Sequence, residues 1–274
     1  MIVSAADDTP LFVQERGEGY PLILLHGLGS HSGWLDADLD HFARTRRVIA
    51  LDSRGHGRSG HPASFTLADH VSDVLTVMDS LGIAQADVMG TSMGSYVAQA
   101  LAAGHPQRVS RLILIVPKAS GQTSGTAALM AQHEGELRDL NPQQAQAFLL
   151  NLMFAPDTPQ AIRDEVARRT AADHAAGLAQ TPEQAEAARR ALEHFDVRPG
   201  LPHVTAPTLI LSGAHDPLNP PPAGADIAAL VQHARQEVMA HSGHFPALEE
   251  TQRYRALVDA FLADGQSAVK GASS

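Results

Sequence analysis

The backbone of this chain has little freedom at residues 90–94, which read Gly-Thr-Ser-Met-Gly. An apolar run at residues 86–89 precedes this motif and an alanine-rich segment at residues 95–103 follows it, so the pattern predicts a strand, a sharp turn and a helix. Glycine stands on both sides because a side chain there would collide with the neighbouring strand and helix. Ser92 lies at the apex, beside a helix N-terminus that stabilises negative charge, and is therefore a candidate nucleophile. The alternative is a turn with a purely structural role.

Short apolar runs alternate with helical patterns along most of the chain. The runs are bounded by turn residues, and several are apolar throughout, as expected for strands buried on both faces. They comprise residues 10–14, 22–25, 48–51, 86–89, 112–116, 208–211 and, more weakly, 237–240. Helical patterns span residues 67–81, 95–103 and 247–262. This alternation predicts an α/β fold with a mostly parallel sheet flanked by helices on both faces.

No strand-like run occurs between residues 119 and 198. Helix-forming segments follow one another there, and three of them have proline at or near the start, where it is tolerated. They span residues 126–137, 142–153, 159–178 and 182–195. We expect residues 119–198 to form a helical cap on a core made of residues 1–118 and 199–265. We expect residues 266–274, which are small and polar, to form a flexible tail.

A serine hydroxyl needs a base to take its proton and a third group to orient that base. In a parallel sheet these groups are expected in the loops that follow the strands. Asp216 follows the run at residues 208–211, and His244 lies in the loop after residues 237–240. The candidate set, in chain order, is thus Ser92, Asp216 and His244.

This order of serine, acid and histidine resembles the α/β-hydrolase fold family. Residues 26–29 (His-Gly-Leu-Gly) and residues 52–59 (Asp-Ser-Arg-Gly-His-Gly-Arg-Ser) are similar to that family as well. The resemblance extends from residue 9 to residue 262 and is weakest in the helical insertion. Within the family, these segments are most similar to small esterases and enol-lactonases, such as 3-oxoadipate enol-lactonase.

The resemblance implies a role for each candidate residue. Ser92 would attack an acyl carbon, His244 would transfer the proton, and Asp216 would orient the imidazole. The developing oxyanion would accept hydrogen bonds from the backbone N–H groups of Leu28 and Met93. We therefore expect an oxyanion hole made of backbone atoms.

Two of these assignments have an alternative. His241 could be the base instead of His244, although Gly-His-Phe at residues 243–245 matches the family motif. Asp216 could be a simple turn residue. The other loop in which the family carries its acid, residues 117–120, offers no carboxylate.

Three further polar residues belong to the family-like segments. His26 is expected to brace its loop through hydrogen bonds. Arg54 and His56 are expected to tie a structural turn, and a role in binding is the alternative.

The cap is rich in apolar side chains at residues 148–154, and most of them should pack the insertion on the core. Met153 and Phe154 are candidates for lining an acyl pocket. Trp34, the only tryptophan, is a third candidate because it follows the Leu28 loop, with core packing as the alternative.

Composition excludes several other functions. The chain has no cysteine, so a disulfide, a thiolate nucleophile or a Cys-ligated metal is ruled out. A net charge of −10 argues against a nucleic-acid surface. Fifteen histidines show no metal-ligand spacing, and residues 27–33 do not match a dinucleotide fingerprint, so we expect neither a metal nor a cofactor. Without a secretory signal at its start or a long apolar segment, the chain is expected to be cytoplasmic and not membrane-bound.

A serine at the turn disfavours epoxide hydrolases and haloalkane dehalogenases, which resemble this fold but carry aspartate there. The expected partner is a small-molecule substrate, namely a carboxylic ester, lactone or thioester cleaved through an acyl-enzyme. Two alternatives stay open: a hydrolase of carbon–carbon bonds that uses the same three residues, and a slow-turnover ligand receptor that retains them. The sequence leaves the oligomeric state open.

Overall fold

One mixed sheet organises the molecule. The computed structural model describes residues 1–121 and 125–263; the predicted tail at residues 266–274 lies outside this range. Across the described residues, eight strands form a sheet in the order β1-β2-β4-β3-β5-β6-β7-β8. The strands are β1 (Ile2–Ser4), β2 (Pro10–Arg16), β3 (Pro21–Leu25), β4 (Arg47–Leu51), β5 (Ala86–Thr91), β6 (Val109–Ile115), β7 (Thr208–Gly213) and β8 (Ala234–Met239).

The strands from β3 to β8 run parallel, and β1 and β2 pair antiparallel at one edge. The predicted mostly parallel sheet is thereby confirmed. Strand β1 was not predicted, because a three-residue edge strand carries too little pattern. Strand β8 begins three residues before its predicted position, because its pairing with β7 extends over residues that are mostly polar.

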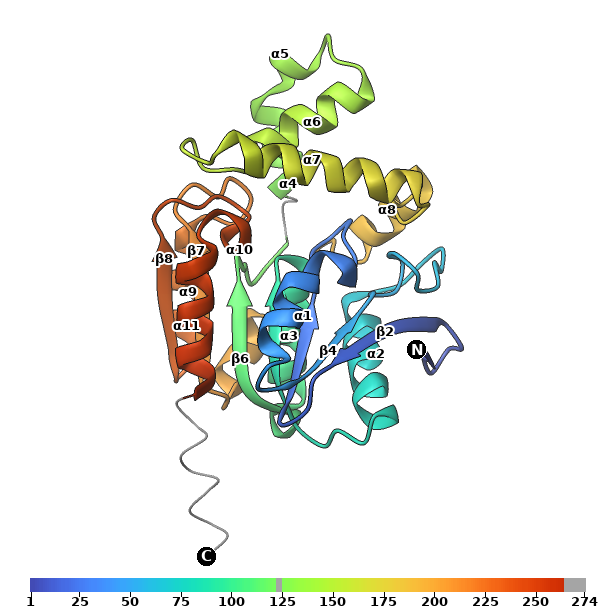
Figure 1. The fold of residues 1–274 in the computed structure, drawn as a ribbon, viewed down its shortest axis with the longest axis vertical. Helices are drawn as coiled ribbons and strands as arrows, with labels where there is room; N and C mark the ends of the chain where they lie inside the picture. Colours follow the sequence, from blue (N-terminus) through green and yellow to red (C-terminus); the bar gives the residue numbers. More distant parts are fainter. Residues whose placement is uncertain (122–124, 264–274) are drawn as a thin grey trace, which may run out of the picture.

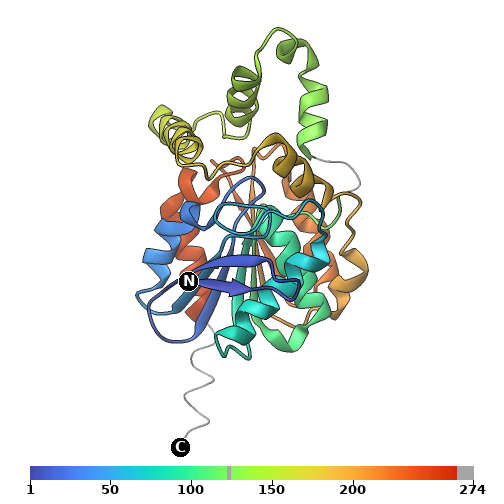
Figure 2. The same cartoon turned by 90° about the vertical axis from the view of Figure 1, so that its right-hand side faces the viewer.

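Helices cover both faces of the sheet, because side chains of a strand point alternately to either side. Ile23 and Leu25 belong to the apolar cluster beneath α2, α3 and α9, whereas Leu22 and Leu24 belong to the cluster beneath α1 and α11. Figures 1 and 2 show the two helical layers. The helices of the layers are α1 (Asp36–Phe42), α2 (Leu67–Ser80), α3 (Met93–Gly104), α9 (Pro221–Leu230), α10 (Pro246–Glu249) and α11 (Thr251–Ala263), with the short 3₁₀ helices η1 (Ser32–Leu35), η2 (Pro106–Arg108) and η3 (Arg198–His203).

Five helices between β6 and β7 lie beyond the end of the sheet toward which β6 points (Figure 1). We call them the cap helices: α4 (Gly125–Gln132), α5 (Glu134–Leu137), α6 (Pro142–Leu152), α7 (Gln160–Ala175) and α8 (Pro182–Arg190). Asn141 and Thr181 close capping boxes at the starts of α6 and α8. Parallel strands present their following loops at this same end, so the cap helices lie at the end of the sheet that carries the predicted site residues.

Two predicted helices are each divided in the structure. The helix predicted at residues 126–137 breaks at His133, where φ is −113° and ψ is 25°. The helix predicted at residues 247–262 breaks at Glu250, where φ is −127°. None of the helices in residues 1–121 and 125–263 has the length and apolar character needed to cross a bilayer.

Candidate active site

Ser92 occupies a strained turn between β5 and α3. Its φ of 51° is unusual for a residue with a side chain, and its N–H donates to the Ile115 carbonyl at 2.9 Å. A Cβ at Gly90 would lie 2.2 Å from the Gly94 carbonyl oxygen, and one at Gly94 would lie 2.3 Å from the Leu25 carbonyl oxygen. The close packing of backbone on backbone is what holds the serine in this conformation.

The structure brings Ser92, Asp216 and His244 together. His244 Nε2 lies 3.1 Å from Ser92 Oγ, and His244 Nδ1 lies 2.8 Å from Asp216 Oδ2. Only 6% of His244 and 3% of Asp216 is exposed. When the Nδ1–H group donates its hydrogen bond to the carboxylate, Nε2 carries a lone pair that faces the hydroxyl. This arrangement is suited to removing the hydroxyl proton.

The surroundings of Asp216 favour its charged form. Its Oδ1 accepts hydrogen bonds from the N–H groups of Leu218 at 2.8 Å and Asn219 at 3.1 Å. Burial alone would raise the pKa of Asp216, but the charge of His244 and these hydrogen bonds outweigh it, so the pKa lies below its ordinary value. The carboxylate is therefore ionised at neutral pH and can accept a hydrogen bond from the imidazole N–H.

The two residues predicted to supply the oxyanion hole, Leu28 and Met93, belong to segments that lie next to Ser92. Met93 begins α3, and a Cβ on Gly27, next to Leu28, would come within 3.6 Å of the Ser92 Cβ. Within the described part of the chain, neither the Leu28 nor the Met93 N–H donates to a protein acceptor. Their role as donors to an oxyanion stays a prediction.

Trp34 lies at a junction between the core and the cap helices. It borders a cavity of about 390 Å³ whose wall also includes Leu28 and residues of α7. Its indole N–H donates to Asp173 Oδ2 at 2.6 Å, and the guanidinium of Arg169 lies 4.3 Å from the centre of its ring. Ser92, Asp216 and His244 are not among the lining residues of this cavity, so the predicted contact of Trp34 with substrate stays a prediction. The bond to Asp173 ties the Trp34 side chain to α7.

Met153 and Phe154 lie against the loop that carries His244. The carbonyl of Met153 accepts the His244 N–H at 2.7 Å. The Phe154 ring is buried against Phe245, with centroids 4.9 Å apart. Their predicted role in an acyl pocket stays a prediction, because what the structure shows is contact with the histidine loop.

The alternative base, His241, lies elsewhere. It is mostly exposed and its Nδ1 lies 2.7 Å from Asp157 Oδ2. His26 braces its loop: its Nε2 accepts the Ser53 N–H at 2.9 Å, and its Nδ1 lies 2.8 Å from the Gly27 carbonyl. Burial lowers the pKa of His26 to about 4, so this ring is neutral.

Arg54 and His56 belong to the turn that follows β4. The Arg54 guanidinium binds both oxygens of the buried Asp73, and it also contacts Asp7. His56 is fully buried, with its Nδ1 2.9 Å from the Arg54 carbonyl. These contacts tie the turn to α2 and do not point toward Ser92.

Asn219 is a residue of this site that sequence reasoning missed. It is almost fully buried, and its Nδ2 donates to the Val116 carbonyl at 2.6 Å and to the Tyr96 hydroxyl at 2.9 Å. Val116 has a φ of 44°, which is strained for a β-branched residue. Asn219 thus joins the loops after β6 and β7 to α3. Its only sequence signal is its position three residues after Asp216.

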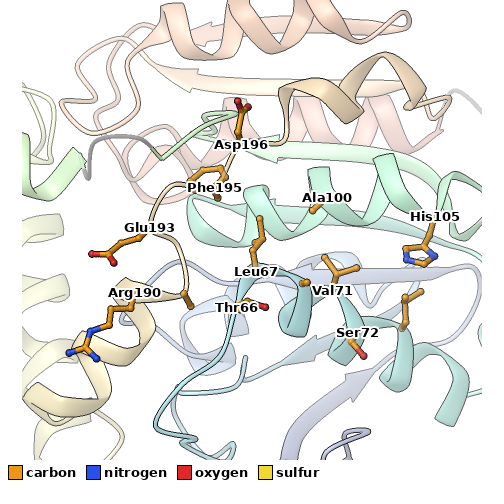
Figure 3. Close-up of a pocket in the computed structure, with 13 residues that line it drawn as sticks. Thr66, Leu67, Val71, Ser72, Ala100, His105, Arg190, Glu193, Phe195 and Asp196 are labelled. Atoms are coloured by element: carbon orange, nitrogen blue, oxygen red, sulfur yellow. The ribbon is translucent and has the colours of Figure 1, made fainter.

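Among residues 1–121 and 125–263, no group of three His, Asp or Glu side chains is arranged to hold a metal ion. A second hollow of about 750 Å³ lies between α2, α3 and the chain that follows α8 (Figure 3). Leu67, Val71 and Phe195 are among its lining residues, and none of the predicted site residues contributes to it.

Comparison with known proteins places the similarity over nearly the whole chain. Residues 20–251 match the alpha/beta hydrolase fold. The chain is 32% identical to 2-hydroxymuconate semialdehyde hydrolase of Pseudomonas putida over 93% of this chain and 91% of that protein. It is 29% identical to 3-oxoadipate enol-lactonase 2 of Acinetobacter baylyi over 88% of each. The crystal structure of the enol-lactonase from Burkholderia xenovorans LB400 matches with a TM-score of 0.81 and 27% identity, over 96% of this chain and 100% of that chain.

Proposed function

Because the chain belongs to the alpha/beta hydrolase fold family, we propose that it is a serine hydrolase that cleaves a carboxylic ester, lactone or thioester through an acyl-enzyme. The observation that carries the proposal is the continuous contact from the Ser92 hydroxyl to His244 at 3.1 Å and from His244 to Asp216 at 2.8 Å. A buried carboxylate, an oriented imidazole and a hydroxyl at a helix N-terminus are the parts that acyl transfer requires.

The first half of the reaction forms the acyl-enzyme. Ser92 Oγ attacks the carbonyl carbon while its proton passes to His244 Nε2, and Asp216 stabilises the imidazolium that results. The carbonyl oxygen becomes an oxyanion that accepts the N–H groups of Leu28 and Met93. When the bond to the leaving group breaks, His244 returns the proton to the departing oxygen or sulfur.

The second half releases the acyl group. A water molecule donates a proton to His244 and attacks the acyl carbon, and the bond to Ser92 Oγ then breaks as the oxygen takes the proton back. The products are a carboxylic acid and the free serine. In this proposal, residues 1–118 and 199–265 form the catalytic core and residues 119–198 form a cap over it. Trp34, Met153 and Phe154 are the candidate contacts to substrate.

A second candidate is the hydrolysis of a carbon–carbon bond by the same three residues. It is favoured by the similarity to 2-hydroxymuconate semialdehyde hydrolase, whose name gives a semialdehyde as the substrate and not an ester or lactone. The similarity to an enol-lactonase favours the first candidate. Turnover of 2-hydroxymuconate semialdehyde and of an enol-lactone, compared as kcat/KM, separates the two.

Ser92→Ala tests the nucleophile. We expect kcat for p-nitrophenyl butyrate to fall at least about 1,000-fold, because only oxyanion stabilisation and binding remain. Ser80→Ala, on the exposed end of α2, is the matched control and should keep wild-type kcat. A fluorophosphonate should label the wild type and the control but not Ser92→Ala. Hydrolysis that survives in Ser92→Ala, or tight ligand binding with negligible turnover in the wild type, would refute the proposal.

A further inference from the structure

The carboxylate of Glu249 accepts four hydrogen bonds from two different parts of the molecule. Its Oε2 accepts the N–H groups of Gly243 at 2.9 Å and Phe245 at 3.1 Å, the two neighbours of His244. Its Oε1 accepts the N–H of Ala155 at 2.7 Å and the hydroxyl of Thr158 at 2.5 Å. One side chain at the end of α10 thus bridges the histidine loop and the turn between α6 and α7.

The histidine loop, residues 240–245 between β8 and α10, is held at three successive backbone positions. The Gly243 and Phe245 N–H groups are bound to Glu249, and the His244 N–H between them donates to the Met153 carbonyl at 2.7 Å. A Cβ on Gly243 would lie 2.1 Å from that same carbonyl oxygen, so glycine is required for the approach. The backbone of His244 is therefore fixed directly against residues of the cap.

The turn between α6 and α7 is itself held by contacts with α7. Arg163, on α7, donates to the Ala155 carbonyl at 2.7 Å and to Asn151 Oδ1 at 2.6 Å. Its guanidinium lies 4.9 Å from the centre of the Phe154 ring. The turn between α6 and α7 is thus held by α7, and Glu249 and Met153 connect it to the loop that carries His244.

We propose that Glu249 is a positioning residue that sets His244 at its distance from Ser92 and makes that distance depend on the docked cap turn. The inference rests on the proposed function for its effect on catalysis. A carboxylate can accept two hydrogen bonds on each oxygen, so Glu249 can hold the loop and the turn at the same time. A glutamine at this position presents an NH₂ group to one of the two pairs of donors, so one side of the bridge must break.

Glu249→Gln and Glu250→Gln form a matched pair. Glu250 is the next residue and its Oε2 accepts the His241 N–H and the Ser242 hydroxyl, so it binds the same loop without bracketing His244. With p-nitrophenyl butyrate, we expect Glu249→Gln to lower kcat about 10- to 100-fold, because a displacement near 1 Å has such an effect. We expect KM to change less than kcat, and Glu250→Gln to stay near the wild type. Equal effects of the two substitutions would overturn the proposal.

Thr158→Val tests the dependence on the cap. This substitution removes one donor to Glu249 Oε1 and leaves both bonds to the histidine loop in place. A partial fall in kcat, in the same direction as that of Glu249→Gln, is the expected result. An unchanged kcat in Thr158→Val would overturn the coupling between the cap turn and His244.

The low-field NMR resonance of the proton between His244 Nδ1 and Asp216 Oδ2 provides a readout that does not require turnover. It should weaken or move upfield in Glu249→Gln and persist in Glu250→Gln. Hydrolysis that survives in Ser92→Ala would refute the proposed function and leave this spectroscopic test intact. If Glu249→Gln does not fold, Thr158→Val carries the same measurement, and an unaltered resonance there contradicts the proposal.

Discussion

Three buried imidazoles lie next to one another where the turn that follows β4 packs against the β3 loop and α2. The ring centroids of His26 and His56 are 5.2 Å apart, and those of His56 and His70 are 6.4 Å apart. Burial lowers the pKa of all three, to about 4 for His26 and about 3 for His70. Because they stay neutral in the folded state and bind protons when unfolded, they make folding dependent on pH.

His70→Gln tests this dependence. Below the ordinary histidine pKa of about 6.5, residue 70 binds a proton in the unfolded state but stays neutral in the folded state. The stability that neutral His70 contributes is therefore present above pH 6.5 and is lost as the pH falls toward 3. Between pH 7 and pH 5 this loss amounts to about 2 kcal/mol. Urea denaturation at both pH values should show a smaller decrease in His70→Gln than in the wild type. An equal decrease in the two proteins would contradict the inference that His70 stays neutral in the folded state.

Asn219 supports the acid loop through its side chain as well as its backbone. Asn219→Leu keeps the branched shape of the side chain but leaves the Tyr96 hydroxyl and the Val116 carbonyl without this partner. We expect the free energy of unfolding to fall by about 1–3 kcal/mol, the usual effect of stranding buried polar groups. Urea denaturation at pH 7 measures it, and an unchanged midpoint and slope would show that Asn219 is dispensable.

The turn between β5 and α3 depends on contacts between whole elements. Helix α3 begins so close to β3 that residue 94 has no space for a side chain, whereas Gly104 at the other end of the same helix has nothing within 4 Å of its Cβ position. The same substitution at these two positions therefore separates steric contact from backbone entropy.

We expect Gly94→Ala to destabilise the protein by about 3 kcal/mol or more, because the atoms it would meet belong to the backbone and cannot rotate away. Gly104→Ala should stabilise it by about 0.5 kcal/mol, since alanine reduces the entropy of the unfolded chain. Thermal unfolding followed by circular dichroism measures both. Similar melting temperatures for the two variants would contradict the close approach of α3 to β3.

In the molecule as a whole, the segment between β6 and β7 contacts the core at two separate places. At one end Glu249 and Met153 join the cap turn to the histidine loop. At the other end, α7 contacts the chain after β3: Asp173 accepts the indole N–H of Trp34. The segment between β6 and β7 therefore contacts the core at two separate places, the loop that carries His244 and the chain that follows β3.

The single tryptophan reports on the second of these points. Asp173→Ala should shift the fluorescence emission of Trp34 to longer wavelength, because the half-buried indole N–H loses its carboxylate acceptor and is hydrated. Asp164→Ala, an exposed position on the same helix, is the control and should leave the emission unchanged. A wild-type spectrum in Asp173→Ala would mean that the position of α7 against Trp34 does not depend on this hydrogen bond.

The pattern of apolar runs predicted the central strands closely, because strands buried on both faces carry a strong local signal. Weak or short elements escaped it. Helix α9 buries only Gly224 and Ile227 and has almost no periodic signal, and β8 is held by its backbone pairing with β7. The break at Glu250 was missed because the carboxylates of Glu249 and Glu250 turn back onto the loop that precedes them.

The sequence by itself was sufficient to identify the family and the mostly parallel sheet, and to select Ser92, Asp216 and His244, which the structure brings within hydrogen-bond distance. Each of these three residues lies in a short motif that directly follows a strand, and such a motif can be recognised from a few neighbouring positions. Only the tertiary structure decided that Glu249 and Asn219 support the site. A periodic pattern tells which face of its own element a residue occupies, but not which distant backbone groups its side chain will meet.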